Sequence, residues 1–389
     1  MRPAGVDTGK GMNRQLSAYL NLLRITAALA VFFAHLCIWQ MNCGLFSRVP
    51  YFGDDGVVAF FVLSGYVIAY TADVKDDTPG KYAISRLTRI YSVVIPAIGL
   101  TIALEWAGTM MFPRIYDSIY DSYQFHHLWL YLPLWLSFSS ESWHLNEPIF
   151  TNGAFWSLCF EVWFYIGFAI WLFLPGIRRT IGLVGVLLLV GPKIALLSIL
   201  WLIGAGSYRL QRQISLSRRT ARLLAAMTLV AFVGVIWSGV DVRLSAVVNT
   251  WLGGYPEAHL QMAWKVPGYS VLALLLAANI FCMRFATMDF LAAFARPLGF
   301  VASFTFSFYI VHLPLLRFYT ALLASRTSSM ALPAALTVAT TAVFGQFTER
   351  RASAWRSVFS SIIKRWPWAD RGIAASIATS TSQSDPPRS

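Results

Sequence analysis

Three ionisable side chains lie inside apolar stretches of this chain, and their types suit the transfer of a chemical group. Arg24 and His35 are eleven residues apart in RITAALAVFFAH, so both face one side of a helix, about 16 Å apart along its axis. Glu161 lies among aromatic residues in FWSLCFEVWFY. A neutral imidazole can act as a general base or a nucleophile, and a carboxylate can orient it and stabilise its charged form. We therefore predict a buried catalytic dyad of His35 and Glu161.

A structural interpretation also exists for each of these residues, because a single histidine or glutamate in a membrane helix often forms an interhelical hydrogen bond. Charged groups at membrane depth cost at least about 2.5–3.5 kcal/mol each, so several together favour a site. Three further residues, Glu105, Ser157 and His312, lie in apolar runs. We predict that they line a substrate pathway, and a purely structural role stays open for Glu105 and His312.

A basic pair marks the start of another apolar run. Arg86 and Arg89 are three residues apart in SRLTRIY, on one side of a helix whose first backbone amides also favour anions. This spacing predicts a phosphate clamp. The alternative is a basic anchor that only holds this end of the helix on the cytoplasmic side of the membrane.

The composition indicates the elements that must position these residues. Of 389 residues, 57% are hydrophobic and only 13% are charged, which is far from the range of soluble domains. The net charge of +13 comes from short basic clusters between apolar runs, so it indicates orientation in a membrane and not nucleic-acid binding. The four cysteines show no spacing typical of a metal site, and we predict neither a metal site nor a disulfide.

Apolar runs long enough to cross a hydrocarbon core of about 30 Å predict the membrane-spanning helices. They lie near residues 18–39, 56–71, 89–111, 154–174, 222–240, 266–283, 299–322 and 329–347. Residues 179–209 are long for one crossing and short for two. Two passes hinged at Gly191 keep the basic cluster at 209–222 on the same side as the other basic segments, so the positive-inside bias favours them.

The predicted fold is therefore all-α: a polytopic integral membrane helical bundle of about ten transmembrane helices, with both termini cytoplasmic. Residues 123–138 are short, aromatic and contain two histidines, and we predict an interfacial or re-entrant segment there. Residues 1–366 form the membrane domain. Residues 367–389 are rich in Ser, Thr, Ala and Pro, which predicts a disordered cytoplasmic tail.

Six stretches, taken in order, resemble the motifs of the acyltransferase family 3 membrane proteins. They are LNLLRITAALAVFFAHL (20–36), FFVLSGYVI (60–68), SRLTRIYSVVIPA (85–97), FWSLCFEVWFY (155–165), SFTFSFYIVHLPLL (303–316) and FTERRASAW (347–355). The chain departs from the family pattern at Val58, where members often have an acidic residue, and carries Asp54 and Asp55 further upstream.

The resemblance implies an O-acyltransferase of the bacterial cytoplasmic (inner) membrane, similar to the short exopolysaccharide and lipopolysaccharide O-antigen O-acetyltransferases. It implies acyl-CoA, acetyl-CoA in the simplest case, as a donor substrate bound by Arg24, Arg86 and Arg89, with no permanently bound cofactor. The acceptor would be a carbohydrate hydroxyl, lipid-linked or on the outer side. His35 would be the general base or carry the acyl group, and Glu161 would fix its tautomer.

Two other classes compete with this interpretation. Buried Arg, His and Glu also occur in transporters, so a flippase of a lipid-linked sugar is the main alternative. The sequence shows no inverted repeat, which weakens that alternative. A membrane receptor or scaffold explains neither the Arg24–His35 stripe nor the arginine pair. Membrane lipid is an expected partner in every case, and the oligomeric state is left open.

Overall fold

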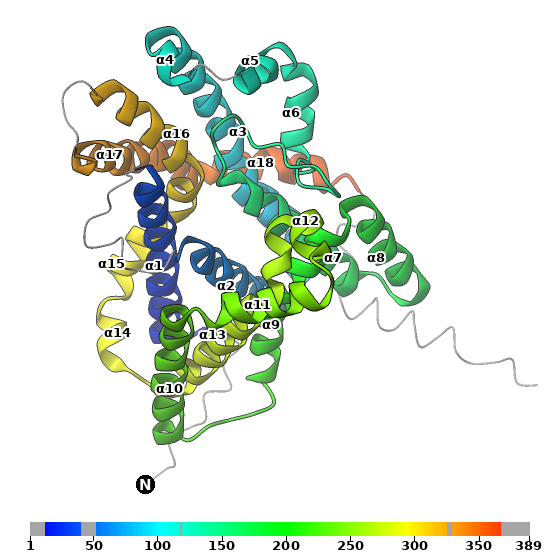
Figure 1. The fold of residues 1–389 in the computed structure, drawn as a ribbon. Helices are drawn as coiled ribbons and strands as arrows, with labels where there is room; N and C mark the ends of the chain where they lie inside the picture. Colours follow the sequence, from blue (N-terminus) through cyan, green and yellow to red (C-terminus); the bar gives the residue numbers. More distant parts are fainter. Residues whose placement is uncertain (1–11, 40–51, 117–118, 325–328, 367–389) are drawn as a thin grey trace, which may run out of the picture.

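The computed structural model of the chain describes residues 12–39, 52–116, 119–324 and 329–366. Within these ranges the chain is helical and contains no strand, only one isolated bridge between Ile149 and Asn152. The helices form one bundle (Figure 1), which confirms the all-α prediction. The predicted tail at 367–389 lies outside the described residues.

Nine helical segments of the described chain are long and apolar enough to cross a membrane. Their main helices are α1 (Arg14–Trp39), α2 (Gly53–Val74), α3 (Pro79–Met111), α7 (Phe155–Phe173), α9 (Pro192–Leu210), α10 (Arg218–Ser238), α13 (Val266–Ala286), α16 (Thr305–Leu323) and α17 (Ala331–Phe347). Each of the predicted spans outside 179–209 overlaps one of them. The third begins ten residues earlier than predicted, because Thr78 caps the helix through the amide of Lys81 and Pro79 occupies its first turn.

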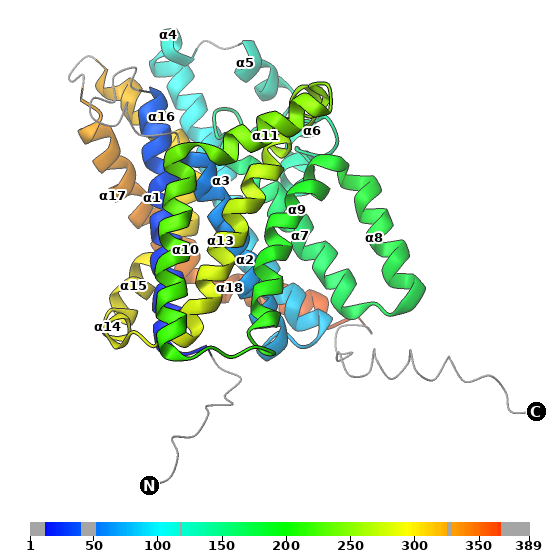
Figure 2. The ribbon, with the colours of Figure 1, turned by 60° about the horizontal axis from the view of Figure 1, so that its bottom comes forward.

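Residues 179–209 form two helices that meet at the predicted hinge. Of the two, only α9 is among the described helices that are long and apolar enough to cross a membrane, so the second pass stays a prediction. Helix α8 (Gly176–Val190) and helix α9 meet at Gly191, which has a φ of 77°. A side chain there would collide with Trp143, whose Cα lies 2.9 Å from the position of a Cβ. The two helices diverge from this junction, with α8 at the edge of the bundle (Figure 2). With 15 residues, α8 is the shortest of the ten principal helices.

Short helices occupy both ends of the bundle. The segment predicted to be interfacial forms α5 (Ile119–His126) and α6 (Leu128–Leu136), neither of which is long enough to span. At the same end lie α11 (Val240–Trp251) and α12 (Tyr255–Leu260), as Figure 2 shows, and α4 (Pro113–Tyr116) follows α3 there. At the opposite end, where α1 begins, lie α14 (Asp289–Ala293), α15 (Ala295–Ala302) and α18 (Ala352–Ile363).

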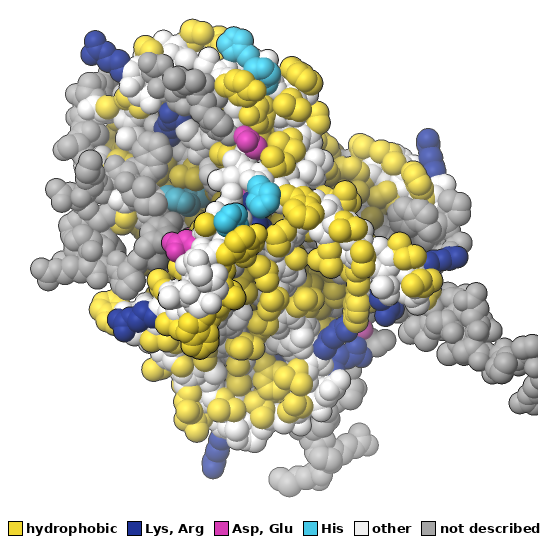
Figure 3. All heavy atoms as spheres, turned by 45° about the vertical axis from the view of Figure 1, so that its right-hand side comes forward, with side chains coloured by type: hydrophobic (Ala, Val, Ile, Leu, Met, Phe, Trp, Pro, Cys, Tyr) yellow, Lys and Arg dark blue, Asp and Glu magenta, His cyan; other side chains and the backbone are white. Residues whose placement is uncertain are grey.

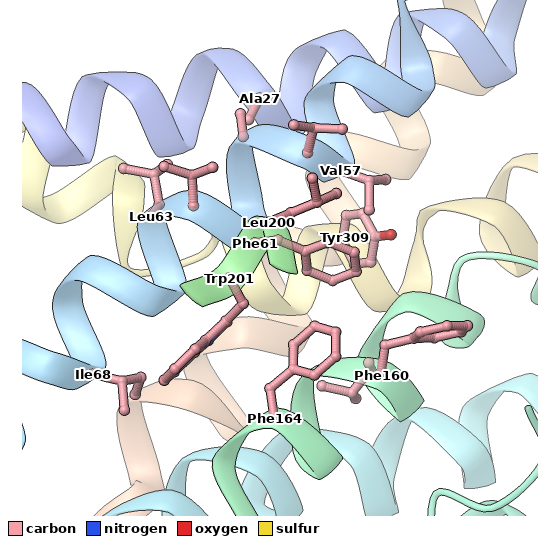
Figure 4. Packing of buried hydrophobic residues seen from close by; sticks show 14 of the residues in the cluster. Ala27, Val57, Phe61, Leu63, Ile68, Phe160, Phe164, Leu200, Trp201 and Tyr309 are labelled. Atoms are coloured by element: carbon pink, nitrogen blue, oxygen red, sulfur yellow. The ribbon is translucent and has the colours of Figure 1, made fainter. Parts of the chain in front are cut away.

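Helix α2 lies at the centre, because small residues let its neighbours approach closely. A Cβ on Gly65 would lie 2.0 Å from the carbonyl oxygen of Trp201, and one on Gly204 would lie 2.1 Å from that of Val62. The backbones of α2 and α9 are therefore in contact, as in other membrane helix pairs with small residues. Aromatic side chains of α7, α9 and α16 pack beside α2 (Figure 4).

The exterior is apolar, as a lipid-facing surface requires. On α10, Val230 and Trp237 are 73% and 68% exposed. The face drawn in Figure 3 is covered mostly by hydrophobic side chains. The chain is thus a multi-pass membrane protein.

One cysteine corrects the sequence analysis. Cys37, in the last turn of α1, forms a disulfide, although none was predicted. The prediction failed because the pairing of cysteines cannot be read from spacing alone. Cys159 and Cys282 are free and buried, in agreement with their expected role as packing thiols.

Candidate active site

Two histidines from distant parts of the chain meet inside the bundle. His35 Nδ1 on α1 lies 3.0 Å from His312 Nε2 on α16, and the ring centroids are 5.1 Å apart. His312 is buried, with 1% exposure, whereas His35 is partly accessible. The aromatic rings of Phe32 and Phe308 pack beside the pair. The predicted partner of His35 was Glu161, and the structure places His312 there instead.

The hydrogen bonds of this pair fix its tautomers. His312 Nδ1 lies 2.8 Å from the carbonyl oxygen of Tyr309 and 3.1 Å from that of Phe308. Carbonyl oxygens only accept, so this nitrogen must carry the proton and Nε2 of a neutral His312 is an acceptor. His35 therefore donates from Nδ1 to His312. The remaining nitrogen of His35, Nε2, keeps its lone pair for a base or a nucleophile.

Glu161 belongs to a separate polar cluster, closer to the beginning of α1. Its Oε1 accepts a hydrogen bond from the hydroxyl of Tyr165, which lies 3.0 Å from Ser64 Oγ. Glu161 also interacts electrostatically with Arg24. No hydrogen bond joins His35 to Glu161 in the part of the chain that the structure describes. The predicted dyad is therefore wrong, because Glu161 lies at the depth of Arg24, about 16 Å of helix away from His35.

Two polar cavities meet at a pair of arginines. The inner cavity, of about 60 Å³, is lined by polar groups that include Ser64, Ser157 and Glu161. The entrance cavity, of about 380 Å³, lies between the beginnings of α1 and α3, helix α15 and the turn at Glu349–Arg351 (η3). Arg24 and Arg89 line both cavities. Among the described residues neither arginine forms a salt bridge, so both guanidinium groups are available for an anionic ligand.

Tyr309 connects the inner cavity to the histidine pair. Its ring lines the inner cavity, and its hydroxyl lies 2.6 Å from Ser157 Oγ. The carbonyl oxygen of Tyr309 accepts a hydrogen bond from His312, which lies one turn further along α16. The centroids of the Tyr309 and His312 rings are 6.2 Å apart. Arg24, the inner cavity and the two histidines thus follow one another along α1 and α16. Ser157, which the sequence analysis predicted to line a substrate pathway, lines the inner cavity, and its role in a pathway stays a prediction.

Arg86 is oriented differently from Arg89. Its Nη2 donates to Asp76 Oδ2 at 2.8 Å and to Ser85 Oγ, and the side chain is buried. It lines neither polar cavity. We predicted from the sequence that Arg86 and Arg89 together form one phosphate clamp. In the structure Asp76, in the loop before α3, neutralises Arg86.

Glu105 was predicted to line a substrate pathway, and in the structure it forms an ion pair between two helices. Arg317 Nη1 on α16 lies 3.2 Å from Glu105 Oε2, and Thr151 donates to Oε1. The Arg317 guanidinium also stacks over the ring of Tyr116 at 4.1 Å. Both charged side chains are buried, and Glu105 lines neither polar cavity. This arrangement favours the structural alternative for Glu105.

The sequence analysis missed several residues around the site. Tyr165 and Tyr309 were not singled out, although the spacing of Tyr165 four residues after Glu161 places it on the same helix face. Asp54, which the sequence analysis named without assigning it a role, accepts hydrogen bonds from Lys265 Nζ at 2.7 Å and from the hydroxyl of Tyr269 at 2.8 Å. It also acts electrostatically on His35, so this aspartate lies near the histidine pair.

The family assignment follows from a comparison with known protein families. The model described as an acyltransferase domain matches residues 17–345. The chain belongs to acyltransferase family 3. This membership confirms the family resemblance. The matched range contains five of the six motifs, the two histidines, Arg24, Arg89 and Glu161, and the sixth motif (347–355) lies beyond its end.

One curated relative is similar to a part of this chain. The exopolysaccharide production protein ExoZ of Rhizobium meliloti (strain 1021) is 32% identical over 126 residues, which are 32% of this chain and 35% of ExoZ. The chain thus matches about a third of the length of that relative. No solved structure matches the chain.

Proposed function

We propose that this membrane acyltransferase transfers an acyl group, acetyl in the simplest case, from acyl-CoA to a hydroxyl of an exported or cell-surface polysaccharide. The observation that supports this most is the continuity of the site along α1 and α16. Two arginines that form no salt bridge with any described residue line the entrance cavity, a narrow inner cavity follows, and the His35–His312 pair lies beyond it.

The arginines suit the nucleotide end of the donor. Arg24 and Arg89 would hold its phosphates through charge-assisted hydrogen bonds, which are shorter and stronger than neutral ones. The entrance cavity of about 380 Å³ has room for a bulky group, whereas the inner cavity of about 60 Å³ accepts only a thin chain such as pantetheine. Arg24 and His35 are about 16 Å apart along α1, a length of the order of an extended pantetheine arm.

His35 would act as the general base. Its Nε2 removes the proton of the acceptor hydroxyl while the hydroxyl oxygen attacks the thioester carbonyl, and the CoA thiolate leaves and takes up a proton. His312 would hold the imidazole in the tautomer that leaves this nitrogen free. A covalent acyl-histidine would form through the same atom, and rapid quenching of the enzyme with radiolabelled acetyl-CoA tests that variant of the mechanism.

The disulfide supports an orientation of the site. Disulfides persist in oxidising compartments, and Cys37 lies two residues after His35. The end of α1 that carries His35 would therefore face the periplasm across a bacterial cytoplasmic membrane, and the entrance cavity and both termini would face the cytoplasm. Donor and acceptor would thus approach from opposite sides.

The relative ExoZ is an exopolysaccharide production protein, which supports an exopolysaccharide as acceptor. The proposal includes a lipid-linked precursor of the polysaccharide as the acceptor. The test uses the purified full chain in nanodiscs, with radiolabelled acetyl-CoA and extracted polysaccharide. We expect donor-dependent label in the polysaccharide, and a loss of about 10²–10⁴-fold in His35→Ala, which is the usual contribution of a general base. Transport of a lipid-linked sugar without any acyl transfer or acyl-CoA hydrolysis would overturn the proposal in favour of a flippase.

A further inference from the structure

An apolar cleft separate from both polar cavities lies between α7, α8 and α9. Its volume of about 480 Å³ falls in the range of about 300–1,000 Å³ that is usual for ligand sites. Aromatic rings from α7 and α9 form much of its wall, among them Trp163, Phe168 and Trp201. The cleft is partly open, and α8, which forms one of its walls, diverges from α9 at the edge of the bundle (Figure 2).

One end of this cleft is basic. The guanidinium of Arg209, in the last turn of α9, lies 4.0 Å from the ring centroid of Trp171, and that of Arg179, in the first turn of α8, lies 5.8 Å from the same ring. Neither forms a salt bridge with a carboxylate in the described ranges of the chain. Asp73 acts on Arg209 electrostatically, but its two oxygens bond to Arg212.

The backbone adds to this positive end. Helix α8 begins at Gly176 after Pro175, and no side chain caps its first amides. Free amides and the helix dipole favour an anion at such an end. A phosphate between α8 and α9 would thus meet two guanidinium groups and the start of a helix.

Two glycines leave the apolar part of the cleft open. Gly167 on α7 and Gly206 on α9 line it, and a Cβ on either would meet no atom within 4 Å. The space in front of both glycines is therefore not needed for contact between the helices. Larger side chains would fill it without displacing the backbone.

We propose that this cleft binds one anionic phospholipid, with its phosphate between Arg179 and Arg209 and its acyl chains against the aromatic wall. A free anion would leave the apolar wall unused, and a zwitterionic lipid would neutralise the arginines less well. Basic pockets between membrane helices on the cytoplasmic side are typical sites for anionic headgroups. This lipid site is separate from the acyl-transfer site, because Trp201 stands between them and donates to Ser64 of the inner cavity.

Native mass spectrometry tests the proposal on the full chain released from nanodiscs of phosphatidylglycerol and phosphatidylcholine. We expect one retained phosphatidylglycerol in preference to phosphatidylcholine. The double variant Arg179→Gln/Arg209→Gln should reduce this preference about tenfold or more, because each basic group near an anionic headgroup contributes about 1 kcal/mol. The matched control Arg218→Gln/Arg219→Gln removes the same charge from the exposed start of α10 and should keep the preference.

A second pair of variants tests the apolar part. Gly167→Leu and Gly206→Leu should each displace the retained lipid, and Gly234→Leu, at an equally open position on α10, should not. The proposal is overturned if both lipids are retained equally, or if neither the arginine nor the glycine variants change retention. It is also overturned if the cleft holds another occupant, either a polyprenyl phosphate or a second copy of the chain. Because retention is measured without acyl transfer, failure of this proposal is distinguishable from failure of the proposed reaction.

Discussion

Replacing His312 tests whether it positions His35. His312→Phe removes the acceptor that lies 3.0 Å from His35 Nδ1. A hydrogen bond contributes about 0.5–1.5 kcal/mol, and each 1.36 kcal/mol is tenfold in rate, so kcat should fall roughly 2- to 10-fold. His312→Gln keeps an acceptor and should retain most of the rate. The KM for acyl-CoA should be unchanged in both variants, because His312 lines neither polar cavity.

The double variant separates positioning from folding. If His312 acts only through His35, then His35→Ala/His312→Phe should be no slower than His35→Ala, because the two residues act as one unit. The assay is transfer of radiolabelled acetyl groups by the purified chain in nanodiscs, with the thermal midpoint of each variant measured alongside. Losses that multiply in the double variant, or a rate for His312→Phe that only follows the amount of folded protein, would refute the positioning role.

Three further outcomes are expected. Arg89→Gln should raise the KM for acyl-CoA about 10- to 100-fold, since hydrogen bonds to charged groups contribute about 1.5–3 kcal/mol. Arg86→Gln should change this KM much less, because Asp76 already neutralises Arg86. Initial rates measured against donor concentration decide between the two. Glu105→Gln should lower stability by about 3–5 kcal/mol in thermal unfolding, because it breaks the buried ion pair with Arg317, and Glu105→Leu/Arg317→Met should recover much of that loss. Burial raises the pKa of Glu141 from 4.5 to about 7, so the folded chain binds this proton more tightly than the unfolded chain. The contribution of the protonated carboxyl to stability should be complete below about pH 4.5 and lost as the pH rises through about 7. Glu141→Gln should flatten the dependence of the thermal midpoint on pH.

The spans could be predicted because their signal is contained in single segments. Each long apolar run became a helix, and the basic residues after 209 were enough to divide 179–209 into α8 and α9. The short helix α11 (Val240–Trp251) was not predicted, because twelve residues with mixed polarity carry no spanning signal. The first turns of α3 were missed for a related reason, since their Thr-Pro cap lies outside the apolar run.

The site was predicted less well, because its pairings join different helices. The sequence identified His35, Glu161 and His312 separately, but the rotation and depth of each helix decide which of them meet. An error of a few turns in depth gave His35 the wrong partner, Glu161 in place of His312. The spacing of Arg86 and Arg89 was also correct on the helix, but it contains no information about Asp76 in the preceding loop.

The interaction partners of a buried charged residue distinguish a ligand site from a structural ion pair better than the depth of that residue in the membrane does. Glu105 and Arg317 neutralise each other across two helices and line neither polar cavity, which is how a chain makes a costly group tolerable in a membrane. Arg24 and Arg89 repel each other, form no salt bridge in the described residues and line both cavities. Glu161 and Glu349 act on Arg24 electrostatically without forming a salt bridge, and an anionic ligand in the entrance cavity would offset the repulsion between the two arginines further. For this reason the proposed donor site, more than the histidine pair, supports acyl transfer as the function of this fold.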